Sequence, residues 1–300
     1  MSRLVMSRLV GCIRRLAVPL AGWARRLSPA KLAISVVAGA AVAIVLAERP
    51  LTAPLPSTVS IADMTWVEVR SAIEAGYTRA IVPSGGIEQN GPHMILGKHD
   101  HIVAWTAERI ARELGHTLVT PVVAYVPEGS YAPPTGHMRF PGTIGVTEDA
   151  FAGVLDGIAR SLKAGGFKTI CFIADHGASM KPQNEVAARL AREWASEGIT
   201  VISVDDYYTA AGDEQNKYLE AQGETLATIG QHAGITDTSE LMAVHPAGVD
   251  LTRLARLPLR VEPTGVDGDP RLASAERGQA LLNLKVTAAV RQIRQASPTQ

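Results

Sequence analysis

The chain has 300 residues, of which 46% are hydrophobic and 19% charged, and this composition predicts a well-packed globular body. Its 29 basic and 29 acidic residues balance, but seven of the basic residues and none of the acidic ones lie before residue 48. The rest of the chain therefore has 22 basic against 29 acidic residues, and a body with this negative charge is not expected to bind nucleic acid.

The first 47 residues have the pattern of an export segment. Arginine-rich sequence precedes the apolar run 32–47, which is longer than most signal-peptide cores but shorter than the roughly 20 residues that span a bilayer. Arg25 and Arg26 resemble a twin-arginine export signal. We predict either a leader cleaved after Ala47 or an uncleaved anchor in the inner membrane. The body would then be periplasmic or held on the outer face of that membrane.

After a predicted linker at 48–60, helical and extended patterns alternate through a body that spans residues 61–300. Buried strands are predicted at 79–83, 116–126, 168–174 and 199–205, and Cys171 is expected at a buried position of the third. Helices are predicted at 64–75, 100–114, 147–165, 183–197, 212–223, 236–244 and 276–296. The repeated order of strand, loop and helix predicts an α/β fold with a mainly parallel sheet and helices on both faces.

Potential metal ligands collect in loops that follow the predicted strands. The loops after parallel strands open at the same edge of a sheet, so residues far apart in sequence can meet there. Imidazoles and carboxylates are the ligands that zinc, manganese and iron take. With a proton carrier close by, such a set is sufficient for hydrolysis by a metal-activated water. The candidates are Glu88, His93, His99, Asp100, His137, Asp175, His176, His232 and Asp237.

Several of these residues also have a purely structural explanation. Asp100 alone fits the N-cap of the helix that it opens, and Asp237 fits an early helical carboxylate that interacts with the helix dipole. His93, beside a proline, fits a loop-packing residue. Glu88 and His176 are harder to explain by packing, because each lies in a glycine-containing loop directly after a strand.

Four motifs, in order along residues 62–250, resemble the creatininase family of metal-dependent amidohydrolases. The segments GIEQNGPH (86–93) and GKHD (97–100) resemble the family signature G-x-x-E-Q-H-G-P-H-x-P-x-G-x-D. The segment HMRFPGT (137–143) resembles H-x-x-F-P-G-T, and DHG (175–177) resembles the turn N-G-H-G. The segments HAG (232–234) and DTS (237–239) resemble H-A-G-x-x-E-T-S. The resemblance implies a three-layer αβα sandwich, often hexameric, that hydrolyses amide bonds in small, often cyclic, substrates.

The resemblance also implies a site for one or two divalent metal ions, such as Zn, Mn or Fe. Glu88 and His176 match metal ligands of the family, and Asp100 matches its bridging carboxylate. One extra residue separates Asp100 from Glu88, so His99 is the alternative at that place. Asp237 stands where the family usually has Glu.

Two expected ligands of the second metal are replaced. Asn90 stands in place of a histidine, and Ala178 in place of an acid. His99, His101 or Asp237 would compensate.

The sequence therefore predicts a metal-dependent amidohydrolase for small amide substrates, with residues 61–300 as its catalytic domain and a homo-oligomer as its assembly. Either His232 or Asp175 would move protons between the attacking water and the leaving nitrogen. The residues expected to contact the substrate are His137, Asn90 and His93. Two alternatives stay open: a non-catalytic relative that binds a small molecule or a metal, and a lactone or ester hydrolase that uses the same site.

Overall fold

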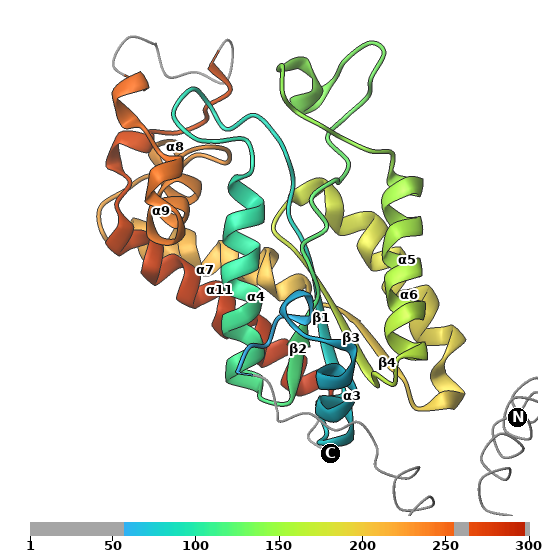
Figure 1. Ribbon diagram of the computed structural model, residues 1–300. Coiled ribbons are helices and arrows are strands. Elements are labelled where there is room, and N and C mark those ends of the chain that lie inside the picture. Colours follow the sequence, from blue (N-terminus) through green and yellow to red (C-terminus); the bar gives the residue numbers. More distant parts are fainter. Residues whose placement is uncertain (1–56, 255–263, 298–300) are drawn as a thin grey trace, which may run out of the picture. The chain divides into compact units, whose positions relative to one another are not determined.

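Four parallel strands form the centre of the fold (Figure 1). The structure, a computed structural model, describes residues 57–254 and 264–297. The strands are hydrogen-bonded in the order β2-β1-β3-β4. Their bounds are β1 (Arg79–Ser84), β2 (Thr117–Val119), β3 (Thr169–Ala174) and β4 (Thr200–Ser203). The predicted parallel sheet is confirmed. The predicted export segment, with most of the predicted linker, lies outside the described residues.

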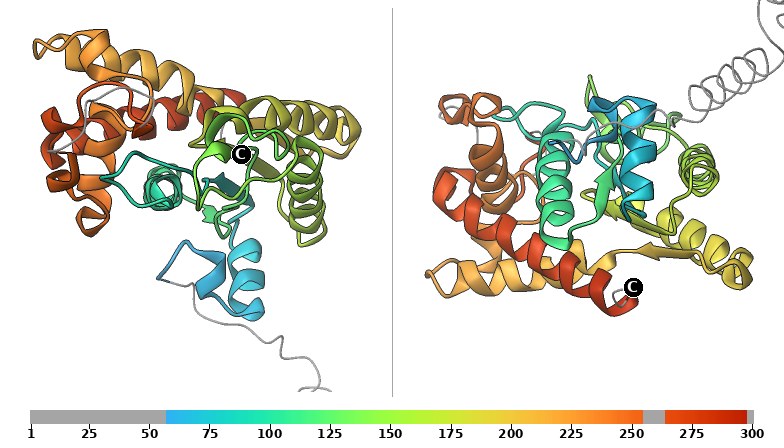
Figure 2. Two further views of the ribbon diagram at one scale, coloured as in Figure 1. Left: turned by 90° about the horizontal axis from the view of Figure 1, so that it is seen from above. Right: turned by 60° about the horizontal axis from the view of Figure 1, so that its bottom comes forward.

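Helices cover both faces of this sheet, so the fold has the predicted three layers (Figure 2). The helices α3 (Trp66–Glu74), α5 (Glu148–Ala164) and α6 (Met180–Glu193) pack on one face. The helices α4 (Lys98–Leu114) and α11 (Ala275–Ala296) pack on the other. Between β4 and residue 254, the described chain forms three further helices: α7 (Thr209–Glu220), α8 (Leu226–Ile229) and α9 (Ile235–Val244).

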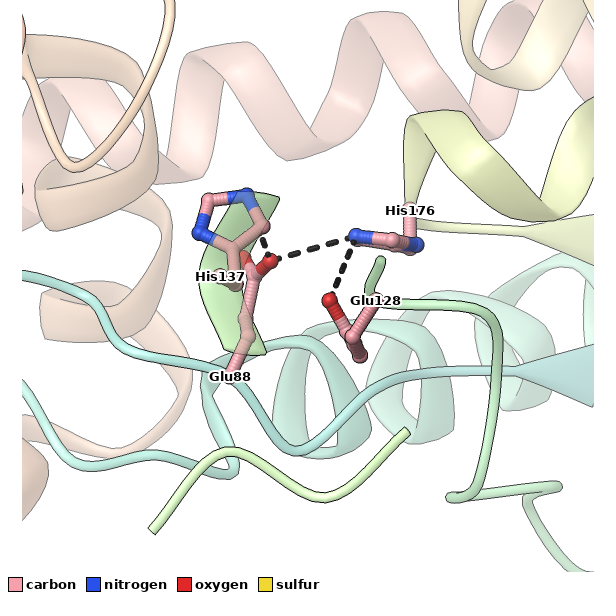
Figure 3. A group of neighbouring side chains, drawn as sticks. All are labelled: Glu88, Glu128, His137 and His176. Atoms are coloured by element: carbon pink, nitrogen blue, oxygen red, sulfur yellow. Dashed lines mark ion pairs between the residues drawn. The ribbon is translucent and has the colours of Figure 1, made fainter. Parts of the chain in front are cut away.

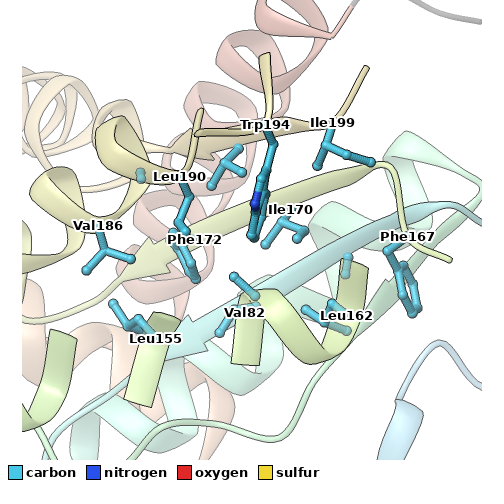
Figure 4. Packing of buried hydrophobic residues seen from close by; sticks show 14 of the residues in the cluster. Val82, Leu155, Leu162, Phe167, Ile170, Phe172, Val186, Leu190, Trp194 and Ile199 are labelled. Atoms are coloured by element: carbon cyan, nitrogen blue, oxygen red, sulfur yellow. The ribbon is translucent and has the colours of Figure 1, made fainter. Parts of the chain in front are cut away.

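Two hydrophobic clusters lie between the sheet and its helices, one on each face. Because successive strand residues point to opposite faces, neighbours in one strand belong to different clusters. Val82 and Phe172 pack against Leu155 and Trp194 (Figure 4). Cys171, buried in β3 as predicted, belongs to the opposite cluster with residues of α4 and α11. Burial of both strand faces explains why the strands read as continuous apolar runs.

Several predicted elements differ in extent from the observed ones, by up to four residues at a helix end. The predicted strand 116–126 pairs as a strand only over β2, because Pro121 has no N–H for the ladder, and the chain then pairs again only at a bridge between Val123 and Ser84. The helix expected to begin at Asp100 begins at Lys98, after Gly97. Among the described residues, no helix is long and apolar enough to cross a membrane.

The connections diverge between β1 and β3, and this divergence creates the place for a site. From β1 the chain passes through α4 to β2, whereas from β3 it passes through α6 to β4 on the opposite side. Ser84 and Ala174 pair at the carboxyl ends of these two central strands. In open α/β sheets, ligands bind at such a switch point. The loops that begin at residues 85 and 175 are therefore expected to form one site.

Candidate metal centre

Four side chains from three different loops meet at this switch point (Figure 3). Glu88 follows β1, Glu128 and His137 lie in the long loop between β2 and α5, and His176 follows β3. One ligand atom from each of the four lies within 4.8 Å of those of the others. The Nε2 atom of His176 is 3.1 Å from Oε2 of Glu88 and 3.2 Å from Oε2 of Glu128. His137 Nε2 is 3.2 Å from the same oxygen of Glu88.

The carboxylate oxygens of this group fit a metal ion because they lack other partners. Oε2 of Glu88 and both side-chain oxygens of Glu128 are buried, and within the described part of the chain they accept no hydrogen bond. A buried polar atom without a partner is costly, and a cation bound between the oxygens would remove that cost. Two carboxylates and two imidazoles form a donor set that zinc and manganese accept.

The protonation of these groups follows from their neighbours. Burial favours the neutral form of Glu88, but the charges of His99 and Lys98 outweigh it and hold the pKa of Glu88 well below its usual value. Burial raises the pKa of Glu128. Burial works against the charged form of His176, yet its contacts with Glu128 and Glu88 raise the pKa of His176 to about 9. In the metal-free protein, a proton on His176 therefore occupies the place of a cation.

His99 lies behind Glu88 and has no free ring nitrogen in this arrangement. Its Nε2 is 2.7 Å from Oε1 of Glu88, and its Nδ1 is 2.7 Å from Oδ2 of Asp175. Ionised carboxylates only accept hydrogen bonds, so both ring nitrogens donate and the ring is an imidazolium. The other oxygen of Asp175 accepts hydrogen bonds from Tyr207 (2.8 Å) and Lys285 (2.7 Å). These contacts hold Asp175 as a carboxylate, with a pKa of about 2 although the group is buried.

Asp237 pairs with a lysine that the sequence analysis did not consider. Its Oδ2 is 2.9 Å from Nζ of Lys98 and also accepts the backbone N–H of Ala233 at 2.7 Å. Lys98 is fully buried, and its Nζ is 3.4 Å from Oε1 of Glu88. Burial alone would lower the pKa of Lys98, but Asp237 and Glu88 raise it.

Asp100, Asn90 and His93 hold the loop that carries Glu88. Asp100 lies outside the group of four, and its Oδ1 accepts the backbone N–H of Gly86 at 3.0 Å. Asn90 donates to the carbonyl oxygen of Glu88 at 3.0 Å and to that of Ile95 at 3.1 Å. His93 Nε2 lies 2.9 Å from the hydroxyl of Thr238. The structure thus places the predicted ligand Asp100, and the predicted substrate contacts Asn90 and His93, in hydrogen bonds within the protein.

His232 and His137 line the cavity in front of the centre. His232 donates from Nε2 to the carbonyl oxygen of Gln89 at 2.9 Å, and its Nδ1 is 3.8 Å from Oε1 of Glu88. His137 was predicted to contact the substrate, whereas its Nε2 lies among the four donor atoms. The cavity has a volume of about 940 Å³ and extends past Tyr208.

Glu128 is the member of the group that sequence reasoning missed. It lies two residues after the end of the predicted strand 116–126, at the start of a loop rich in proline and glycine. That is the same position that singled out Glu88, so the signal was present. In that loop, the sequence prediction considered only the segment around His137.

With the geometry established, comparison with known proteins settles the family. The family described as creatinine amidohydrolase matches residues 62–293. The chain belongs to the creatininase family. Creatinine amidohydrolase of Pseudomonas putida is 25% identical over 263 residues, which cover 81% of this chain and 99% of that protein. The mycofactocin precursor peptide peptidase of Mycolicibacterium smegmatis is 26% identical over 239 residues, which cover 73% of this chain and 85% of that protein.

A solved creatininase gives the same result for the fold. The structure of a mutant creatininase of the Zn-Zn type is similar to this chain with a TM-score of 0.64. The two are 25% identical, and the match covers 81% of this chain and 100% of the creatininase chain. Members of the family are metal-dependent amidohydrolases, so the predicted family, fold and enzyme class are confirmed.

Proposed function

We propose that this chain hydrolyses a C–N amide bond in a small substrate with one divalent transition-metal ion, Zn²⁺ or Mn²⁺. The observation that carries the proposal is the meeting of Glu88, Glu128, His137 and His176 with three buried carboxylate oxygens that lack hydrogen bonds. The family assignment and the open cavity of about 940 Å³ support a hydrolase over a purely structural metal site.

These four residues would hold the ion between them, with Glu88 and His137 on one side and Glu128 and His176 on the other (Figure 3). When bound, the ion would supply Lewis acidity that activates a water and polarises the amide carbonyl. His137 is oriented through its other nitrogen, since the side-chain amide of Gln89 lies 3.1 Å from Nδ1. Such partners fix the ring of a metal-binding histidine.

His232 is the better candidate of the two predicted proton carriers. Its Nε2 is committed to a backbone carbonyl, so Nδ1 is unprotonated in the neutral ring and faces Glu88. Burial and the charge of Lys98 lower the pKa of His232, which keeps the ring neutral and able to take a proton from water. The same proton would then pass to the leaving nitrogen. Asp175 is unsuited to this role, because its two oxygens are occupied by three donors.

The test is metal-dependent hydrolysis by the full chain. We expect turnover of at least one member of a panel of creatinine, other cyclic amides and short peptides, abolished by a chelator and restored by Zn²⁺ or Mn²⁺. His176→Ala should abolish both the turnover and the stoichiometric metal, whereas an exposed change such as Glu74→Gln should alter neither. Stoichiometric metal without hydrolysis of any amide would instead favour a non-catalytic relative, and turnover confined to lactones or esters would contradict the proposed bond.

Export and self-association are part of the same proposal. The arginine-rich start and the apolar run 32–47 support transfer of the body to the periplasm or its anchoring to the inner membrane. Cell fractionation with N-terminal sequencing tests this statement.

The exposed aromatic side chains of Tyr125 (55%) and Tyr131 (53%), with Ile144 (49%), support a homo-oligomer, a hexamer being the expected form. Light scattering of the purified chain tests this form, and a monomer would refute it.

A further inference from the structure

A lysine ammonium lies on the far side of Glu88 from the proposed metal ion. Lys98 is the first residue of α4 and has no exposed surface. Its Nζ is 2.9 Å from Oδ2 of Asp237 and 3.4 Å from Oε1 of Glu88. Buried lysines are rare and require partners, and here the partners are two carboxylates.

The groups around this ammonium are those of a second metal site. Oε1 of Glu88 is also 2.7 Å from Nε2 of His99 and 3.8 Å from Nδ1 of His232. The imidazoles of His99 and His232 therefore lie beside this oxygen, and the carboxylate of Asp237 is linked to it through Lys98 Nζ. Residues of these types bind transition metals once the histidine ligand has released its proton, so the set would suit a metal if the lysine were absent. Oε2 of Glu88, by contrast, faces His137 and His176 and has no hydrogen bond among the described residues.

We infer that the ammonium of Lys98 is a built-in second cation, which occupies the place beside Oε1 of Glu88 and limits the centre to one metal ion. The inference rests on the proposed function, because it assumes an ion at Oε2. A second divalent ion at Oε1 would have to displace the ammonium from Glu88 and Asp237 and would be repelled by it at short range. The ammonium is covalently attached, so this half of the centre is complete without free metal.

Lys98 is then a positioning residue. With its Oε1 already paired, Glu88 presents Oε2 to the ion as a single, oriented ligand atom. Asp237, which also accepts from the backbone of Ala233, links this arrangement to the segment that carries His232.

The experiment is the ratio of bound Zn²⁺ to full-length chain, measured by elemental analysis after dialysis against Zn²⁺ and by calorimetric titration. We expect a ratio of one for the wild type and two for Lys98→Ala, since that change removes the cation that faces Glu88 Oε1 and Asp237 Oδ2. Lys98→Arg keeps the positive charge and should stay at one. The double variant Lys98→Ala with Asp237→Asn should return to one. If Lys98→Ala does not fold, the longer neutral side chain of Lys98→Gln takes its place.

The outcomes separate this inference from the proposed function. A ratio of two in the wild type would overturn the inference, and so would a ratio of one in both Lys98→Ala and Lys98→Gln at saturating Zn²⁺. Either result would leave a metal-dependent enzyme intact. A ratio of zero in the wild type would refute the proposed function itself.

Discussion

The choice between Glu128 and Asp100 as a metal ligand can be decided by two substitutions that conserve shape. Glu128→Gln removes the charge of a buried side chain whose two oxygens lack hydrogen bonds. Asp100→Asn removes the charge of a carboxylate whose Oδ1 already accepts the N–H of Gly86, and an amide oxygen can still accept that bond. The structure therefore predicts opposite outcomes for two acids of the same centre.

The expected loss of metal affinity is large for Glu128→Gln. Even partners outside the ligand set change metal affinity by about 10- to 100-fold, so loss of a direct carboxylate should weaken Zn²⁺ binding by at least about 100-fold. That corresponds to about 2.7 kcal/mol. Asp100→Asn should stay within about 10-fold of the wild type, because its role is in the loop and not at the ion.

In the metal-free protein, Glu128→Gln should not lower the free energy of unfolding and should instead raise it slightly. Burial raises the pKa of Glu128, which means that the folded protein holds its ionised form less well than the unfolded chain does. A neutral glutamine removes this penalty, so metal-free Glu128→Gln should be as stable as the wild type or more stable by about 1 kcal/mol. A general folding defect would instead lower both stability and affinity.

A competition titration with a chromophoric Zn²⁺ chelator gives the affinities, and urea unfolding in excess chelator gives the stabilities. The reasoning is refuted if Asp100→Asn loses Zn²⁺ while Glu128→Gln retains it. In that case Asp100, as the sequence motif implied, would be the ligand.

Three further predictions concern the groups around the ion. The pKa of His176 is about 9, and its proton must leave before the metal binds, so Zn²⁺ affinity should rise about tenfold per pH unit from pH 7 to pH 9 and then level off. An affinity that does not change over this range would contradict the assignment of His176 as a ligand. His232→Asn should lower kcat by about 10²- to 10⁴-fold at unchanged zinc content, and loss of zinc instead would argue against its role as proton carrier. Lys285→Met leaves the buried carboxylate of Glu240 without a cation and that of Asp175 with His99 alone, so it should lower the free energy of unfolding by about 3–5 kcal/mol. A loss below about 1 kcal/mol in urea unfolding would contradict this role of Lys285.

The sequence was sufficient for the sheet and for part of the centre. Apolar runs separated by helical patterns predicted all four strands, and the rule that sites follow strand ends found Glu88 and His176. Glu128 obeys the same rule, because it lies two residues after the predicted strand 116–126, but only the segment around His137 was considered in that loop.

The rest depended on contacts that spacing along the chain does not reveal. Lys98 and Asp237 are 139 positions apart, and a lysine at the start of a helix is ordinarily a solvated residue. His99 resembled a ligand by type, but its two carboxylate partners come from segments 11 and 76 positions away. The packing of α4 against α9, β1 and β3 brings these charges together.

These contacts form a row of alternating charges that gives the two oxygens of Glu88 different roles. The row runs from Glu88 to His99, Asp175, Lys285 and Glu240, and every neighbouring pair lies within 2.8 Å. Removing a member would take a partner from each buried charge beside it, so the row resists rearrangement. It fixes Oε1 of Glu88 on its protein side and leaves Oε2 as the atom that still needs a cation. A metal ion at Oε2 therefore completes an arrangement of charges that the fold has already built.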